Sequence, residues 1–183
     1  MPLSQSSSRQ EIHHRQVNLK AYHRDDGMFD IEAHLVDTKP FPFERLLSEH
    51  PAPAGSHLHD LWLRMVVDGN YIVQSVEAAS DSTPYAVCKE AGAGLSVLVG
   101  ERVGRGWSKL VKEKLRGAAG CTHLNEMLLP MATAAIQGIR GIRREELFSN
   151  DETGKPHKLN SCYAYATHRE VVRVTWPEHY RPS

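Results

Sequence analysis

The sequence is poor in the features that mark secreted, disulfide-bonded and membrane proteins. It has only three cysteines, an odd number, so the thiols are expected to be free or metal-bound rather than paired. No apolar run is long enough to span a bilayer, and the polar residues 1–10 lack the apolar stretch of a signal peptide. We therefore expect a cytoplasmic protein that has no membrane partner.

Neither sign of charge is in excess, because 22 Lys and Arg residues balance 22 Asp and Glu residues. A nucleic-acid-binding protein needs surplus cations that displace counterions from phosphates, so no nucleic-acid partner is expected. The chain has 183 residues, of which 40% are hydrophobic, and this is enough for one domain with its own core. Its 11 histidines are many for this length and include candidate metal ligands.

Strand patterns occupy the first half of the chain. The polar residues 1–16 are expected to form a disordered arm. Residues 17–37 and 61–79 each predict a β-hairpin, because alternating apolar residues flank the turn sequences Asp25-Asp26-Gly27 and Asp68-Gly69-Asn70. The proline-rich residues 38–55 between the hairpins predict a loop with a short helical turn at 43–47.

Helical spacing follows the second hairpin. Helices are expected over residues 83–98 and 107–115, and a longer helix begins at Cys121 or Thr122. One apolar stripe on this last helix is formed by Leu124, Met127, Leu128, Met131, Ala135 and Ile139. Pro130 is expected to kink or split the helix. Farther on, residues 163–166 and 171–176 are expected to be short strands.

Strands followed by helices favour an α+β fold, with an antiparallel sheet of hairpins and helices packed on one face. We expect a single domain over residues 17–149, and residues 150–183 packing on it as a C-terminal extension. A basic face on the helix near residues 109–116 is interpreted as solvated, with anion steering as the alternative. The sheet edge and such basic faces would allow a homodimer but do not require one.

Cys121 is a candidate metal ligand or nucleophile because it opens the longest helix. A helix N-terminus stabilises a thiolate through its free N–H groups and its positive dipole end. His123 can reach the same space from the first turn of the helix. The alternative is a capping turn with a half-buried thiol and a surface histidine.

Cys88 and the segment His57-Leu58-His59-Asp60 supply further candidates. In an extended strand His57 and His59 point to one face, where such a pair can bind one metal, and Asp60 points to the other, unless the alternation is broken near the strand entrance. Asp60 and His59 are candidates for acid–base catalysis, and Asp60 is also a candidate metal ligand with Cys88. The alternatives are that Cys88 is a buried packing residue and that residues 57–60 are a solvent-exposed polar segment before a core strand.

The central residues 57–142 resemble, in layout, the iron–sulfur scaffold family of IscU and the N-terminal part of NifU. The shared features are a strand led by Asp60, a hairpin, a helix, and Cys121 at the head of a long helix. The resemblance implies a partly exposed metal or cluster site built from three cysteines with an Asp and a His. The family's first cysteine would fall near Leu58, its second near Asp81 or Ser82, and its histidine on Gly120.

The whole chain also resembles a bacterial family known only as a domain of unknown function. The stretches that carry this resemblance are residues 24–31, the run Gly-Cys-Thr-His-Leu within residues 117–124, and the late Cys162. This resemblance implies no reaction.

These residues support three hypotheses. The first is a Zn or Fe protein, an enzyme of the lyase or hydrolase type on a small molecule, with Cys88, Cys121 and His123 as ligands together with Asp60 or His59. The second is an iron–sulfur cluster or sulfur carrier, and the third is a metal-free enzyme or ligand-binding protein. A shared site requires the start of the second hairpin to lie beside the start of the last long helix.

Overall fold

The computed structural model describes residues 3–182, and the chain falls into two compact units that divide between Gly138 and Ile139. Residues 1–2 of the expected arm and residue 183 of the expected extension lie outside the described residues. Residues 3–13 form neither helix nor strand, and their side chains are exposed. The first unit contains the sheet and the helices that cover it, and each unit is described by itself.

The first unit contains a four-stranded antiparallel sheet in the order β1-β2-β3-β4. Its strands are β1 (His14–His23), β2 (Phe29–Thr38), β3 (His57–Val67) and β4 (Val73–Ser82). Both predicted hairpins are therefore confirmed, although β1 begins at His14, three residues before the expected start. In the second hairpin Asp68 caps the turn by accepting hydrogen bonds from the backbone N–H groups of Asn70 and Ile72 at 2.8 and 2.9 Å.

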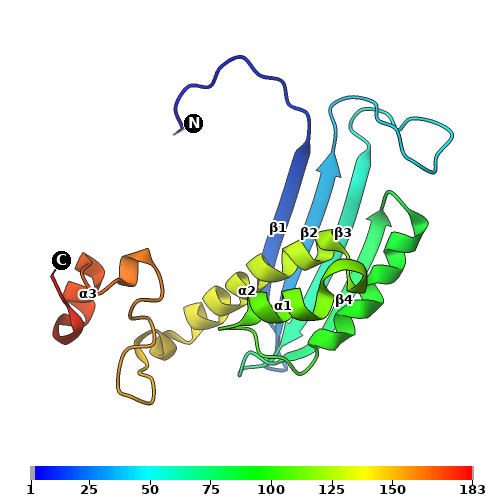
Figure 1. The fold of residues 1–183 in the computed structure, drawn as a ribbon. Coiled ribbons are helices and arrows are strands. Elements are labelled where there is room, and N and C mark those ends of the chain that lie inside the picture. Colours follow the sequence, from blue (N-terminus) through cyan, green and yellow to red (C-terminus); the bar gives the residue numbers. More distant parts are fainter. Residues whose placement is uncertain (1–2, 183) are drawn as a thin grey trace. The chain divides into compact units, whose positions relative to one another are not determined.

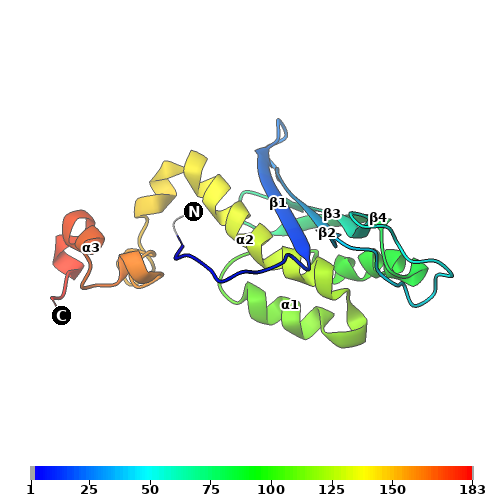
Figure 2. The same cartoon turned by 90° about the horizontal axis from the view of Figure 1, so that it is seen from above.

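The two central strands alternate between a buried and a more exposed face, strictly along β2 and as far as Met65 along β3, after which Val66 and Val67 are both buried. On β2 the buried face begins with Phe29 and Ile31 and ends with Asp37. On β3 it runs from His59 through Leu61 to Met65. The helices cover this buried face, and Figures 1 and 2 both show α1 (Trp107–Leu115) and α2 (Thr122–Ile142) on the same side of the sheet.

The predicted apolar stripe of α2 is confirmed. All six of its residues are buried, namely Leu124, Met127, Leu128, Met131, Ala135 and Ile139. The helix continues through Pro130 instead of splitting, at the cost of the one backbone hydrogen bond that proline cannot donate. Burial of the stripe from Leu124 to Ala135, within the first unit, outweighs this loss.

The segment before α1 differs from the expected α-helix. Residues Ala86–Leu98 form a 3₁₀ helix, η1, that packs against β4. The two glycines of this segment explain the tight packing, because a Cβ on Gly92 would lie 3.1 Å from Ala78 Cβ, and one on Gly94 would lie 3.2 Å from the Ala119 carbonyl oxygen. Only Leu95 and Leu98 are buried in η1.

The loop between β2 and β3 closes without the expected helical turn at residues 43–47. Instead Phe43 pairs with Ala52 through two backbone hydrogen bonds of 3.0 and 2.8 Å. The Gly55 N–H donates to the Lys39 carbonyl at 2.8 Å, so the two ends of the loop lie together where β2 stops and β3 starts.

The second unit is helical where short strands were expected. Residues Tyr163–Tyr165 form the 3₁₀ helix η4, and Glu170–Thr175 form α3. The expectation of strands was wrong, because the four-residue spacing of the buried Val172 and Trp176 fits one face of either a strand or a helix. The Trp176 N–H donates to the Val172 carbonyl at 2.8 Å, as a helix requires. The unit also contains η3 (Arg144–Phe148) and η5 (Pro177–His179).

Of the helices in the described part of the chain, none combines the length and the apolar character that crossing a membrane requires.

Replacement of Leu128 by Ala tests the packing of α2 on the sheet. Leu128 is fully buried, so the change should lower the free energy of unfolding by about 3 kcal/mol. The neighbouring Leu129 is 37% exposed, and Leu129→Ala should cost less than about 1 kcal/mol. Urea unfolding followed by circular dichroism measures both, and equal losses would contradict the assigned helix face.

Candidate functional site

Four of the candidate residues lie at one partly enclosed cavity of about 230 Å³ on the helix side of the sheet. They are His59, Cys88, Cys121 and His123. The rings of His59 and His123 are in contact, with centroids 3.7 Å apart. The start of β3 therefore lies beside the start of α2, as a shared site requires.

Local chain geometry places Cys121 at the N-terminus of α2. Its carbonyl accepts the N–H of Asn125 at 2.9 Å, the first hydrogen bond of the helix. Gly120 is required before it, because a Cβ there would lie 2.7 Å from the Leu115 carbonyl oxygen. A side chain at this position would push apart the two helices that the glycine joins.

The thiol of Cys121 is activated by its neighbours. Its Sγ lies 3.9 Å from His123 Nδ1. The hydrogen bond with His123 lowers the pKa of Cys121, and backbone N–H groups of Leu124 and His123 add to this effect against the opposing effect of burial. A thiolate at this position can bind a metal or attack an electrophile.

His59 reaches the cavity from β3, and its ring is held from behind by a carboxylate. Its Nδ1 lies 2.9 Å from Asp37 Oδ2, across the β2–β3 pair in which these two residues are direct partners. Burial lowers the pKa of His59, although Asp37 opposes the shift. The imidazole is therefore neutral near pH 7, and the bond to Asp37 leaves Nε2 as its free acceptor.

Asp37 is fully buried, and Arg15 compensates its charge. Arg15 Nε and Nη2 donate to the two carboxylate oxygens at 2.7 and 2.8 Å, which is a bidentate pair. Burial alone would raise the pKa of Asp37, but Arg15 and then His59 outweigh it and hold this pKa below its usual range. A further Arg15 nitrogen, Nη1, donates to Glu126 of α2 at 2.7 Å.

Among the described residues, one set of three side chains brings possible metal-ligand atoms within 4.8 Å of one another. It consists of Asp37, His59 and His123. The hydrogen bonds of Asp37 decide its role within this set. Both of its oxygens already accept from Arg15, one also accepts from His59, and His13 Nε2 lies 3.3 Å from the other. Asp37 therefore orients His59 and leaves its Nε2 free, and His123 and Cys121, which pair with each other at 3.9 Å, line the same cavity.

Asp60, which the sequence suggested both as a metal ligand and as a catalytic residue, lies on the opposite face of the sheet. Its two oxygens lie 2.7 Å from His34 Nε2 and 2.8 Å from His57 Nδ1. Burial would raise the pKa of Asp60, but these two histidines lower it below its usual range. Asp60 is thus part of a separate cluster and does not reach the cavity.

His57 departs from the expected alternation. It was expected on the same face as His59, yet it bonds to Asp60. The pairing of β2 with β3 shifts register between Asp37 and Thr38, which pair with His59 and His57, so the strand is irregular at its entrance.

Sequence reasoning missed Asp37, Arg15 and His34. Asp37 could have been found, because it continues the buried alternation of β2 and is therefore a charged residue at a core position. Arg15 and His34 carry no such signal, because both lie at partly exposed or exposed strand positions.

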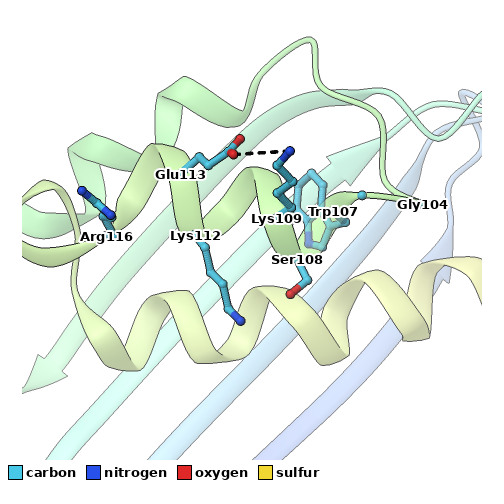
Figure 3. Close-up of a pocket in the computed structure, with 8 residues that line it drawn as sticks. Gly104, Trp107, Ser108, Lys109, Lys112, Glu113 and Arg116 are labelled. Carbon is cyan, nitrogen blue, oxygen red and sulfur yellow. Dashed lines mark ion pairs between the residues drawn. The ribbon is translucent and has the colours of Figure 1, made fainter.

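A second, larger hollow of about 980 Å³ lies over α1 and holds none of the candidate residues (Figure 3). Its lining comes from α1 and the loop that precedes it, with the basic side chains of Lys109, Lys112 and Arg116. Lys109 pairs with Glu113 at 3.7 Å, and both are well exposed. This arrangement supports the interpretation of a solvated basic face.

Replacement of Arg15 should show how much its ion pair with the buried Asp37 carboxylate stabilises the folded protein. Arg15→Met leaves Asp37 charged and without its main partner, so the free energy of unfolding should fall by about 3 kcal/mol. Arg64 pairs with Glu32 at 2.8 Å on the exposed face, and Arg64→Met should cost less than about 1 kcal/mol. Thermal and urea unfolding compare the two, and similar losses would mean that Asp37 does not depend on Arg15.

Comparison with known proteins places the first unit in a family. No curated protein and no solved structure matches the chain, so the likeness in layout to the IscU and NifU scaffolds finds no support there. Residues 13–137 match the family described as "Protein of unknown function (DUF2889)". This match includes the sheet, α1, most of α2 and every residue that lines the cavity. The chain belongs to the DUF2889 family.

Proposed function

We propose that this protein holds a single Zn or Fe ion through His59, His123 and Cys121 and uses it to act on a small molecule in the cavity. One observation carries the proposal: a histidine backed by a buried carboxylate and a cysteine–histidine pair face the same cavity. Cys88 lines this cavity and is the candidate for a fourth ligand.

The protonation states of these groups suit a metal. A metal ligand must present a lone pair, and His59 is neutral because burial lowers its pKa. The lowered pKa of Cys121 favours the thiolate that binds Zn and Fe. The bond from His59 to Asp37 is the outer-shell contact that fixes a metal-binding imidazole in protein sites.

When only His59, His123 and Cys121 bind, one coordination position stays open for water or substrate, which is the pattern of catalytic zinc sites, whereas Cys88 as a fourth ligand would close it. The ion would then polarise a carbonyl or activate a bound water, as lyases and hydrolases require. His59, His123 and Cys121 come from two elements that pack together, so the ligand set depends on the folded sheet–helix interface.

Metal analysis of protein purified without chelator tests this proposal. The wild-type chain should carry about one Zn or Fe per chain, and His59→Ala or Cys121→Ser should remove most of it because each loses a ligand. Matched controls are His34→Ala on the opposite sheet face and Cys162→Ser in the second unit, which should retain the metal. A metal-free wild type whose melting temperature does not respond to added Zn or Fe would refute the proposal.

The same preparation separates a mononuclear ion from an iron–sulfur cluster. A brown, oxygen-sensitive protein after anaerobic reconstitution would favour a cluster carrier, whereas a colourless protein with bound zinc would favour the mononuclear site. Two cavity cysteines, Cys88 and Cys121, are the thiolates that such a cluster could use here.

A second candidate is metal-free thiol chemistry, which the pairing of Cys121 with His123 favours. In this case Cys121 attacks the substrate, and the Asp37-backed His59 acts as a general base.

Alkylation by iodoacetamide at pH 7 distinguishes the two candidates. If no metal is bound, Cys121 should react about tenfold faster than the exposed Cys162, and His123→Ala should slow it. If zinc is bound, Cys121 should be protected until a chelator is added. Mass spectrometry of the labelled peptides reports each site, and slow labelling of Cys121 both with and without chelator would exclude an activated thiol.

A further inference from the structure

The cavity beside the candidate metal ligands has an apolar wall and a few hydroxyl groups. Its apolar side chains are Leu61, Pro84, Tyr85 and Leu124. Its hydroxyl groups belong to Ser80, Thr83 and Thr122. Leu61 and Leu124 are 2% and 1% exposed, so both are fixed by the core behind them. The cavity therefore offers a rigid apolar surface next to the imidazoles and thiols.

The described residues that line this cavity include no permanently charged side chain. Among its lining residues in the described part of the chain there is no Lys, Arg, Asp or Glu. Arg15 does not line the cavity, and its guanidinium is already hydrogen-bonded to Asp37 and Glu126. Recognition of phosphate groups relies on Arg, Lys or a helix end with free donors, and the Cys121 thiol already engages the N–H groups at the start of α2. The cavity therefore lacks the groups that would bind the phosphate of a nucleotide or of a phosphorylated substrate.

The size of the cavity limits its ligand to about one ring. Its volume is about 230 Å³, whereas an apolar cavity of about 150 Å³ is known to hold benzene. The difference leaves room for a small substituent but not for a second ring and a substituent together.

The mouth of the cavity is shaped before any ligand binds. Tyr85 is 36% exposed and begins the turn from β4 into η1. The Thr83 hydroxyl donates to the Tyr85 carbonyl at 2.9 Å, and the Cys88 N–H donates to the same oxygen at 3.1 Å. These bonds anchor the backbone that carries Tyr85, so the apolar wall is preorganised.

We propose that the substrate is a single-ring compound with one alcohol or carbonyl oxygen. Its ring contacts Leu61, Tyr85 and Leu124, and its oxygen lies toward His59, His123 and Cys121. The ring site rests on the cavity alone, and only the role of the oxygen rests on the proposed metal.

Ligand-observed NMR on the full chain tests this proposal with three matched probes. Benzyl alcohol should bind with a Kd of about 1 mM, as expected for so small a ligand. Toluene, which lacks the oxygen, and 2-naphthalenemethanol, which adds a ring, should each bind at least about tenfold more weakly. Equal or tighter binding of the two-ring alcohol, equal binding of toluene, or no binding of benzyl alcohol at millimolar concentration would overturn the proposal.

Variants locate the binding site. Ser80→Phe fills the cavity and should weaken benzyl alcohol binding at least about tenfold, whereas Ser75→Phe, the same change at an exposed position of β4, should not. Thr122→Phe provides a second obstruction at an exposed position of the lining, should Ser80→Phe fold poorly. Unchanged binding of benzyl alcohol to a cavity variant that folds correctly would overturn the proposal.

Metal content measured on the same samples separates the two proposals. In a metal-free protein, binding of benzyl alcohol that Ser80→Phe weakens and that the two-ring alcohol does not match supports the ring site and refutes the metal centre. Bound metal without any ring binding refutes the ring site and leaves the metal centre standing.

Discussion

The buried carboxylate of Asp37 is the constraint on which the site depends. A charged group without solvent is costly unless it is paired and hydrogen-bonded, and Arg15 and His59 supply this compensation. The same Arg15 reaches Glu126. One ionic network therefore joins β1, β2, β3 and α2 at the end of the sheet where the cavity lies, and the helix cannot shift far without breaking it.

This network also sets the chemical state of the cavity. The bond to Asp37 fixes one nitrogen of His59 as a donor, and burial keeps the ring neutral. His59 then faces His123, which in turn lowers the pKa of Cys121. A cysteine with a lowered pKa and a neutral imidazole with a free lone pair thus lie at one small cavity, which is the common starting point of the metal-bound and the metal-free chemistry proposed above.

Much of the fold could be predicted, because the strands and helices reflect local periodicity. The alternation on β2 and β3 and the stripe on α2 identify core faces without knowledge of the partner segments. The segments predicted less well are those with weak or ambiguous spacing. The glycines of η1 serve close packing, which spacing cannot show, and the pair Val172 and Trp176 fits a strand or a helix until the hydrogen bond between them is known.

The sequence by itself determined that Cys121 heads the long helix, with His123 in its first turn, since both follow from a glycine and a continuous apolar stripe. It also indicated that His59 and Asp60 point to opposite faces of their strand. Only the tertiary structure decided that Asp37, and not Asp60, joins this site. Adjacent strand residues point to opposite faces, and the register across the loop at residues 39–56 determines which carboxylate meets His59. That register is fixed by long-range pairing and by burial of the whole sheet face, which no local pattern contains.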